Sequence, residues 1–233
     1  MVQCSIAGRL QALLLLLIGK PCWCGQFSSA DYWEDRYHTK GNSGAGSYGV
    51  LAAYKAGFLN AFVAAHDVST VIEFGCGDGN QLRQLHHQKY VGFDVSATIL
   101  AQNTKAFAGD RSKSFLHVTD FDVKVHRADL VLSLDVLYHL VEDDVFETYM
   151  QRLFAASQRW VIIYSSNHEH TKNWYASRGS HVRHRMFSSW VRAHQPTWHL
   201  VRHEPNPHNQ STAASFFVFE MCAFRIPPCP HDR

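Results

Sequence analysis

Apolar segments of strand length alternate with segments of helix length through most of this chain. Residues 70–74 read Thr-Val-Ile-Glu-Phe, and residues 128–134 are more strongly apolar still. Short runs rich in β-branched and aromatic residues are typical of buried strands. Strands joined by helix-length connections pair in parallel with right-handed crossovers, so helices cover both faces of the sheet. The pattern therefore predicts an α/β fold with a doubly wound, mostly parallel, Rossmann-like sheet.

The chain ends in a predicted hairpin rather than in another crossover. Its last two strand-like segments are separated by a loop that contains Pro205 and Pro207, and a short connection of this kind joins antiparallel strands. We therefore expect a seven-stranded sheet with a terminal antiparallel strand. The expected strands are 70–74, 90–94, 114–118, 128–134, 159–164, 198–202 and 214–224, and the expected helices are 30–37, 48–65, 81–87, 97–107, 143–156 and 186–194.

Length and composition favour one domain that does not bind nucleic acid. The chain has 233 residues, of which 46% are hydrophobic, enough for one sizeable core. No internal repeat or long low-complexity tract divides it. The formal net charge of +2 lacks the basic excess of proteins that follow a phosphate backbone. We expect a single domain over residues 26–233 and no nucleic-acid partner.

Residues 1–25 are expected to form an arm outside this domain. Residues 10–19 are almost purely apolar, behind Arg9 and ahead of Lys20 and Pro21. The stretch is similar to the core of a signal peptide, but a helix needs about 20 residues to span a bilayer. Two interpretations stay open: a cleaved signal or weak anchor, and a hydrophobic N-terminal helix or mis-assigned start. Membrane contact is expected only if the arm is retained.

The cysteines favour a cytoplasmic location. Six cysteines are too few and too unevenly spaced to form a disulfide framework in a chain of this length. Cys22 and Cys24 lack the two intervening residues of redox and zinc motifs. We expect a reduced compartment, with the secretory pathway as the alternative that the signal-like arm leaves open.

A glycine-rich turn follows the first predicted strand, where open α/β sheets bind their ligands. Residues 73–79 read Glu-Phe-Gly-Cys-Gly-Asp-Gly. Gly75, Gly77 and Gly79 allow positive φ angles and close approach of the backbone to a ligand. A dinucleotide fingerprint has its third glycine three positions after the second, and Asn80 stands there. The spacing therefore disfavours a dinucleotide.

Charges near this turn distinguish two nucleoside cofactors. S-adenosylmethionine presents a sulfonium and an ammonium to such a turn, whereas NAD presents a pyrophosphate. Glu73 and Asp78 suit the cations, because a carboxylate about 4 Å from a pyrophosphate costs on the order of 1 kcal/mol or more. Asp94 ends the second strand and is placed to accept hydrogen bonds from two ribose hydroxyls, in either cofactor. The residues favour S-adenosylmethionine.

At these residues the chain resembles the class I S-adenosylmethionine-dependent methyltransferases, over roughly residues 31–224. The likeness includes residues 134–140, Leu-Asp-Val-Leu-Tyr-His-Leu, after the fourth strand. Residues 32–37 and 44–49 are also similar to a mainly bacterial group of methyltransferase-domain proteins. The aromatic residues of this N-terminal region are expected to form a helical lid over the cofactor.

The resemblance implies a role for each residue of the cofactor site. Glu73 orients the turn, Gly75 and Gly77 contact the methionine moiety, and Asp94 binds the ribose. Asp120, after the third strand, accepts a hydrogen bond from the adenine amino group. The expected cofactor-binding set is Glu73, Gly75, Gly77, Asp78, Gly79, Asp94 and Asp120.

Residues after the fourth strand face the methyl group in this family, which makes Asp135, Tyr138 and His139 the candidate catalytic residues. Methyl transfer is an in-line displacement, and it needs a base only if the acceptor must lose a proton. His139 is the candidate base because an unperturbed imidazole titrates near neutral pH. The alternative is a structural histidine.

The acceptor is expected to be a small oxygen-bearing molecule, such as a sugar or an acidic metabolite. The chain lacks the Asn/Asp-Pro-Pro-Tyr/Phe motif of amide methylation and a Lys-Asp-Lys-Glu set for ribose methylation. Arg183 and Arg185 suit bidentate binding of a carboxylate or phosphate, with a solvated basic turn as the alternative. Nearby histidines lack cysteine or carboxylate partners, so no metal is expected.

Together these features predict a methyltransferase that uses S-adenosylmethionine. Two other classes stay open. A noncatalytic nucleoside-binding module would keep the cofactor residues without transferring a methyl group. An NAD-dependent oxidoreductase would share the fold and Asp94.

Overall fold

A seven-stranded sheet forms the centre of the protein. Its strands are β1 (Thr70–Phe74), β2 (Lys89–Asp94), β3 (Lys113–His117), β4 (Ala128–Leu134), β5 (Ser157–Ser165), β6 (Trp198–Glu204) and β7 (Ser215–Met221). In the computed structural model, which describes residues 27–86, 89–169 and 181–224, their order is β3-β2-β1-β4-β5-β7-β6. Strands β1 to β5 pair in parallel, and β7 is antiparallel to β5 and β6. The predicted sheet and its terminal antiparallel strand are confirmed.

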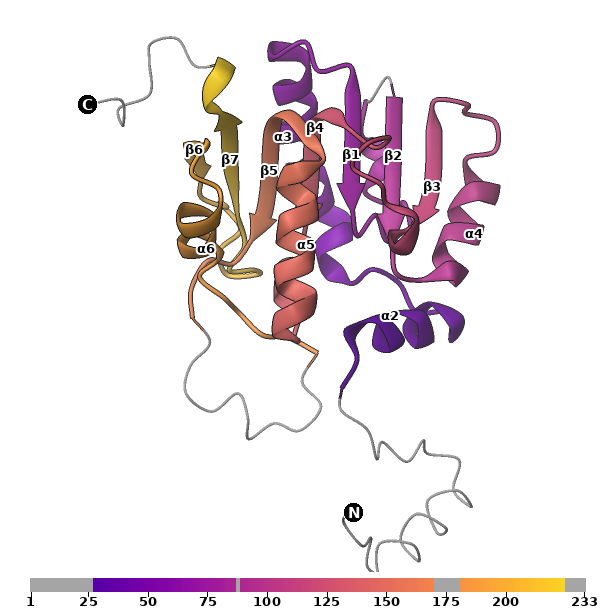
Figure 1. Cartoon of the computed structure of the whole chain (residues 1–233). Helices are drawn as coiled ribbons and strands as arrows, with labels where there is room; N and C mark the ends of the chain where they lie inside the picture. The colour runs from indigo at the N-terminus through magenta and orange to yellow at the C-terminus, as the bar shows by residue number, and fades with distance from the viewer. Residues whose placement is uncertain (1–26, 87–88, 170–180, 225–233) are drawn as a thin grey trace, which may run out of the picture.

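Helices cover both faces of this sheet, as Figure 1 shows. They are α2 (Ser29–His38), α3 (Gly49–Ala65), α4 (Ala97–Ala106), α5 (Asp143–Ala155) and α6 (Phe187–His194). Side chains alternate along each strand, so Val71 joins the core beneath α3 and α4, whereas Ile72 joins the core beneath α5 and α6. The two apolar cores hold the layers together.

The prediction of a helix at residues 81–87 is wrong. Only a 3-10 turn, Leu82–Gln84, forms there, and Leu85 is already extended. A helical residue advances about 1.5 Å and an extended residue about 3.3 Å. The short connection after Gly79 therefore reaches the start of β2 only by leaving the helix after one turn. Leu82 and Leu85 anchor it in the core.

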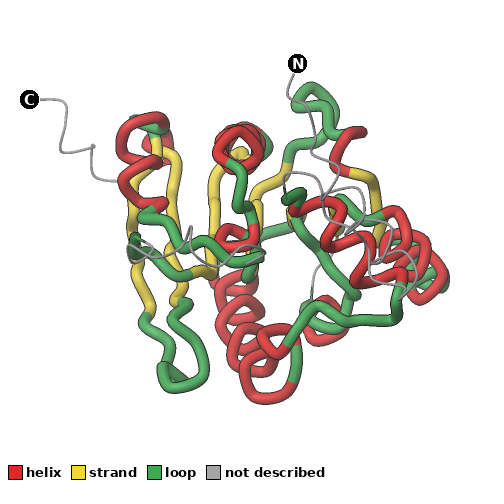
Figure 2. Tube along the Cα trace, turned by 90° about the horizontal axis from the view of Figure 1, so that it is seen from below, coloured by secondary structure: helices red, strands yellow, loops and turns green. Residues whose placement is uncertain are grey.

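Helix α2 lies across the carboxyl edge of the sheet, the edge that faces the viewer in Figure 2. Ser28 caps it by accepting a hydrogen bond from the Asp31 backbone N–H at 3.1 Å. Near its middle, the Glu34 carboxylate accepts from the backbone N–H and the hydroxyl of Thr98, at the start of α4. The predicted arm, residues 1–25, lies outside the described residues. None of the described helices combines the length and apolar character that a transmembrane span requires.

Candidate active site

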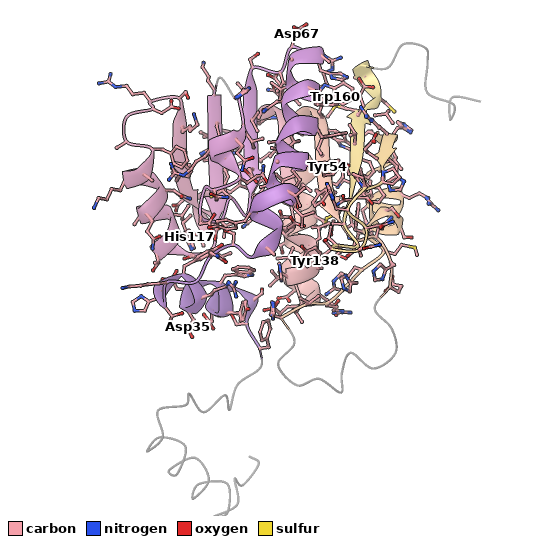
Figure 3. The ribbon with its side chains drawn as sticks, turned by 180° about the vertical axis from the view of Figure 1, so that it is seen from behind. Asp35, Tyr54, Asp67, His117, Tyr138 and Trp160 are labelled. Carbon is pink, nitrogen blue, oxygen red and sulfur yellow. The ribbon has the colours of Figure 1, made fainter. Side chains whose placement is uncertain are left out.

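A cavity of about 370 Å³ lies at the carboxyl ends of β1, β2 and β4. Its walls come from these strand ends, from α2 and α3, and from one face of α5 (Figures 1 and 3). Some of the site residues predicted from the sequence line this cavity, and the others lie outside its wall. Those that line it are Glu73, Gly75, Gly77, Asp94, Asp135 and His139, and those outside its wall are Asp78, Gly79, Asp120, Tyr138, Arg183 and Arg185.

The glycine turn packs against a second loop from the N-terminal region. All three glycines have positive φ, as expected, with Gly77 at 56°. A Cβ atom on Gly77 would lie 2.3 Å from the Ser43 hydroxyl, so a larger residue would displace Ser43 and would also strain the backbone at this positive φ. The Ser43 Oγ accepts from the Asp78 backbone N–H, and the Asp78 carboxylate accepts in return from the Ser43 N–H, both at 2.8 Å. Asp78 therefore holds the two loops together from outside the cavity.

Asp94 connects the end of β2 to the glycine turn. Its Oδ2 accepts from the Gly77 N–H at 2.9 Å, and its Oδ1 accepts from the Ser96 N–H at 3.1 Å. Burial raises the pKa of Asp94, and these backbone donors oppose the rise. An ionised carboxylate in the cavity wall is well suited to accept from ribose hydroxyls.

Asp120 lies on the surface. It ends a 3-10 turn, Val118–Asp120, of which only Val118 lines the cavity. The side chain of Asp120 is exposed. The position after β3 is the one that the resemblance implies, but the structure leaves the carboxylate outside the wall.

Asp135 is held in an unusual backbone conformation beside the cavity. Its φ is +60°, in the left-handed region that costs most residues roughly 1–2 kcal/mol. One carboxylate oxygen is 2.6 Å from the Lys55 Nζ, and the other accepts from the Tyr138 hydroxyl at 2.8 Å. A Cβ atom on Gly46 would lie 2.7 Å from the same carboxylate. The side chain is thus confined on several sides.

Lys55 is a residue that the sequence analysis missed. It lies on α3 with 0% exposure, and its ammonium faces the Tyr164 ring at 5.2 Å from the centroid. Lys55 is the single charged residue of a mostly apolar helix, and this was the available signal, since charged residues are rarely fully buried without a partner. Figure 3 shows α3 crossing the back of the sheet, with Tyr138 near its lower end.

His139 lies in the cavity wall between aromatic neighbours. Its ring is stacked on His181 at 5.4 Å and meets Trp33 edge to face at 4.9 Å. The Nδ1 atom is 3.0 Å from the His181 carbonyl oxygen, so Nδ1 carries the proton and Nε2 is unprotonated in the neutral ring. Burial lowers the pKa of His139 to about 4. His139 was proposed as a base because an ordinary imidazole titrates near neutral pH, and this reason does not hold for the buried ring.

Arg183 and Arg185 face the start of α5 instead of the cavity. Both donate to the Asp143 carboxylate, at 2.9 and 2.6 Å, and both also donate to the Val141 carbonyl. The guanidinium of Arg185 additionally lies 4.8 Å from the Phe146 ring centroid. These contacts fasten residues 183–185 to the loop before α5. Their role as acceptor ligands stays a prediction.

Glu73 is expected to make the stability of the fold depend on pH. Burial raises the pKa of this carboxyl to about 7, although the Tyr90 hydroxyl donates to it at 2.6 Å. Because the folded-state pKa is raised, its stabilising contribution is fully present below the ordinary carboxyl pKa and is lost as pH rises through about 7. We expect the unfolding free energy of the wild type to fall relative to that of Glu73→Gln between pH 5 and pH 8. Urea denaturation across this range measures the difference, and parallel curves would contradict it.

The charges of the cavity wall fit S-adenosylmethionine. Two lining cations, Lys55 and Arg152, stand against the carboxylates of Asp94, Asp135, Glu142 and Asp144, and Glu73 is partly protonated at neutral pH because its pKa is raised to about 7. An acidic wall favours a ligand that carries a sulfonium and an ammonium over one that carries a pyrophosphate. Among the described residues, no group of three or more histidines, cysteines or acids is arranged to hold a metal ion.

Comparison with known proteins finds similarity to methyltransferases. Residues 72–157 match a family model described as a methyltransferase domain. A small RNA 2'-O-methyltransferase of Arabidopsis thaliana is 28% identical over 134 residues, which are 51% of this chain and 14% of that protein. The magnesium protoporphyrin IX methyltransferase of Synechocystis PCC 6803, crystallised with S-adenosylhomocysteine (SAH), has a TM-score of 0.57 at 15% identity and covers 82% of this chain and 97% of its own. The N-methyltransferase NodS of Bradyrhizobium japonicum WM9, also with SAH, has a TM-score of 0.58 at 12% identity, covering 84% and 99%.

Sheet order, glycine turn and acidic cavity together define a class I methyltransferase fold. Residues 72–157 match the methyltransferase-domain model, and methyltransferases crystallised with S-adenosylmethionine or SAH share the fold of this chain. Of the classes predicted from the sequence, these matches favour a methyltransferase over an NAD-dependent oxidoreductase.

Proposed function

We propose that this chain is an S-adenosylmethionine-dependent methyltransferase that acts on the oxygen of a small acceptor, and that this oxygen is acidic. The observation that carries the proposal is the state of His139. Its ring nitrogen Nε2 is unprotonated, but its pKa of about 4 makes it a weak base. A weak base assists little in removing a proton from an alcohol. An acceptor oxygen that is already ionised, as in a carboxylate, needs no such base.

The chain's own residues would bind and orient the two reactants. S-adenosylmethionine supplies an electrophilic methyl group, and its sulfur keeps the electron pair when the new carbon–oxygen bond forms. Asp94 would hold the ribose, and the glycine turn would hold the methionine part. Asp135, fixed by Lys55 and Tyr138, would mark the end of the cavity where the methyl group lies. Such positioning supplies most of the catalysis in a displacement of this kind.

Replacing His139 tests the proposed chemistry. We expect His139→Gln to keep label transfer from S-adenosylmethionine, labelled in its methyl group, into the small-molecule fraction of a cell extract within about tenfold of the wild-type rate. The removal of a required general base typically costs about 10² to 10⁴. A loss of that size, with unchanged cofactor affinity by calorimetry, would mean that His139 removes a proton from a hydroxyl acceptor.

A second candidate is methylation of RNA on a ribose hydroxyl. The observation in its favour is the likeness to the plant small RNA 2'-O-methyltransferase, of which the match spans 14%. The labelled extract separates the two candidates when it is divided into RNA, protein and small-molecule fractions. We expect the label in small acids. Label confined to RNA would overturn the small acceptor, and cofactor binding without any transfer would favour a noncatalytic module.

A further inference from the structure

His139 has a hydrogen-bond acceptor that the described part of the protein leaves unused. The residue lines the cavity and ends the short 3-10 turn after β4, Leu137–His139. Its Nδ1 donates to the His181 carbonyl oxygen, so the lone pair of the neutral ring lies on Nε2. No described residue donates to Nε2, and this atom is not sealed in the core. A ligand in the cavity can therefore donate to it.

The ring of His139 is fixed in this orientation by its neighbours. Trp33 of α2 meets it edge to face at 4.9 Å, the Tyr138 ring lies at 4.6 Å, and His181 stacks on it at 5.4 Å. The bond from Nδ1 to a backbone carbonyl also fixes the tautomer. Burial lowers the pKa of His139 to about 4, so the ring is neutral at physiological pH. Nε2 is thus a permanent acceptor and does not donate.

Strand order indicates which reactant meets His139. The sheet runs β2-β1-β4-β5, as Figure 1 shows, and neighbouring strands are about 4.8 Å apart. Asp94 ends β2 and the glycine turn follows β1, whereas His139 follows β4, on the other side of β1. A nucleoside bound to Asp94 and the glycine turn therefore leaves the β4 side of the cavity for the methyl acceptor.

The surroundings of Nε2 select a neutral donor. An ionised oxygen would be repelled by the lone pair, so the reacting oxygen itself is not the partner of Nε2. Burial and, to a smaller extent, the charge of Arg36 lower the pKa of His139, and both disfavour a ligand ammonium at this point as well. The nearby Asp135 carboxylate is compensated by Lys55 at 2.6 Å. A hydroxyl group is the donor that fits.

We propose that the methyl acceptor is a small hydroxy acid, and that His139 selects it by accepting a hydrogen bond from its hydroxyl group. This inference rests on the proposed methylation of an ionised oxygen. A carboxylate oxygen bonds to the methyl carbon, the carbon–sulfur bond breaks, and the sulfur keeps the electron pair. The products are a methyl ester and SAH, and no proton moves. The hydrogen bond to Nε2 is the same before and during transfer, so His139 determines binding rather than turnover.

Two variants of His139 test this role. His139→Gln keeps an acceptor oxygen on the side chain, whereas His139→Leu has none. Label transfer from S-adenosylmethionine is measured against dilution of the small-molecule fraction of a cell extract, which gives an apparent KM and a maximal rate. We expect His139→Leu to raise the apparent KM about tenfold or more at an unchanged maximal rate, because the hydroxyl of the acceptor loses its partner. His139→Gln should keep both values near those of the wild type.

Two further measurements complete the test. Calorimetry with SAH should give the same affinity for the wild type and both variants, because the cofactor does not contact Nε2. The labelled product of the wild type provides a test that needs no variant. Mild alkali should release labelled methanol from it, as from a methyl ester, and acetic anhydride should acetylate it at an oxygen, which shows a free hydroxyl group.

Several outcomes would overturn the inference. An equal fall of the maximal rate in both variants, with unchanged KM, would make His139 a general base. Weaker binding of SAH by His139→Leu would place the cofactor against Nε2. Wild-type kinetics in His139→Leu, or a labelled ester without a hydroxyl group, would remove the proposed selection. Label confined to RNA or protein, with SAH still bound, would overturn the proposed small acceptor and this inference with it.

Discussion

Asp94→Ala is expected to weaken S-adenosylmethionine binding by about 10² to 10⁴. The carboxylate would accept from two ribose hydroxyls, and hydrogen bonds to a charged group contribute about 1.5–3 kcal/mol each, with a tenfold change in affinity for every 1.4 kcal/mol. The same side chain also accepts from the Gly77 N–H, so its loss loosens the glycine turn as well. Isothermal calorimetry on the purified protein measures the change.

A surface acid provides the control for this variant. Asp122 is exposed and lies outside the cavity wall. Asp122→Ala has the same change of charge and should keep wild-type affinity. An Asp94→Ala protein that binds within tenfold of the wild type would show that the ribose lies elsewhere in the cavity.

Lys55→Met is expected to destabilise the fold by about 3–5 kcal/mol. Breaking a buried ion pair leaves one charge in the interior without its partner. Lys55 and Asp135 fit this case, because their side chains are only 1% and 12% exposed. Methionine fills a similar volume, so the loss reports the stranded Asp135 carboxylate more than a cavity. Urea unfolding at neutral pH measures it.

Two further variants make this result specific. Adding Asp135→Asn to Lys55→Met removes the stranded charge and should restore part of the lost stability. Lys105→Met, at an exposed position near the end of α4, should leave stability near that of the wild type. Equal losses in Lys55→Met and Lys105→Met would contradict the buried ion pair.

Much of the fold was predictable because its signals are local. Runs such as Ala128–Leu134 are apolar enough to be buried on both faces, which only a central strand requires. The three glycines of the turn adopt the positive φ angles that their spacing indicated. The prediction of a helix at residues 81–87 was wrong because the length of this segment is set by the distance to the start of β2. That distance depends on the assembled sheet.

The candidate site was harder to predict, since its contacts join residues far apart in the sequence. Lys55 and Asp135 lie far apart in the sequence, and nothing in the sequence around either residue indicates that they pair. Arg183 and Arg185 showed the right chemistry for binding an anion, but the nearest anion is Asp143 of the same chain. A sequence reveals the chemical type of a side chain more readily than the partner it finds.

We expect helix α2 to influence how fast a ligand leaves the cavity. Two carboxylates hold it across the cavity, Glu142 at its first residue and Glu34 against Thr98 of α4. A ligand beneath such a helix would leave when one of these contacts opens, so local opening of the protein would govern its dwell time. We therefore expect mutations at Glu34 to change the rate at which the demethylated cofactor leaves more than its affinity.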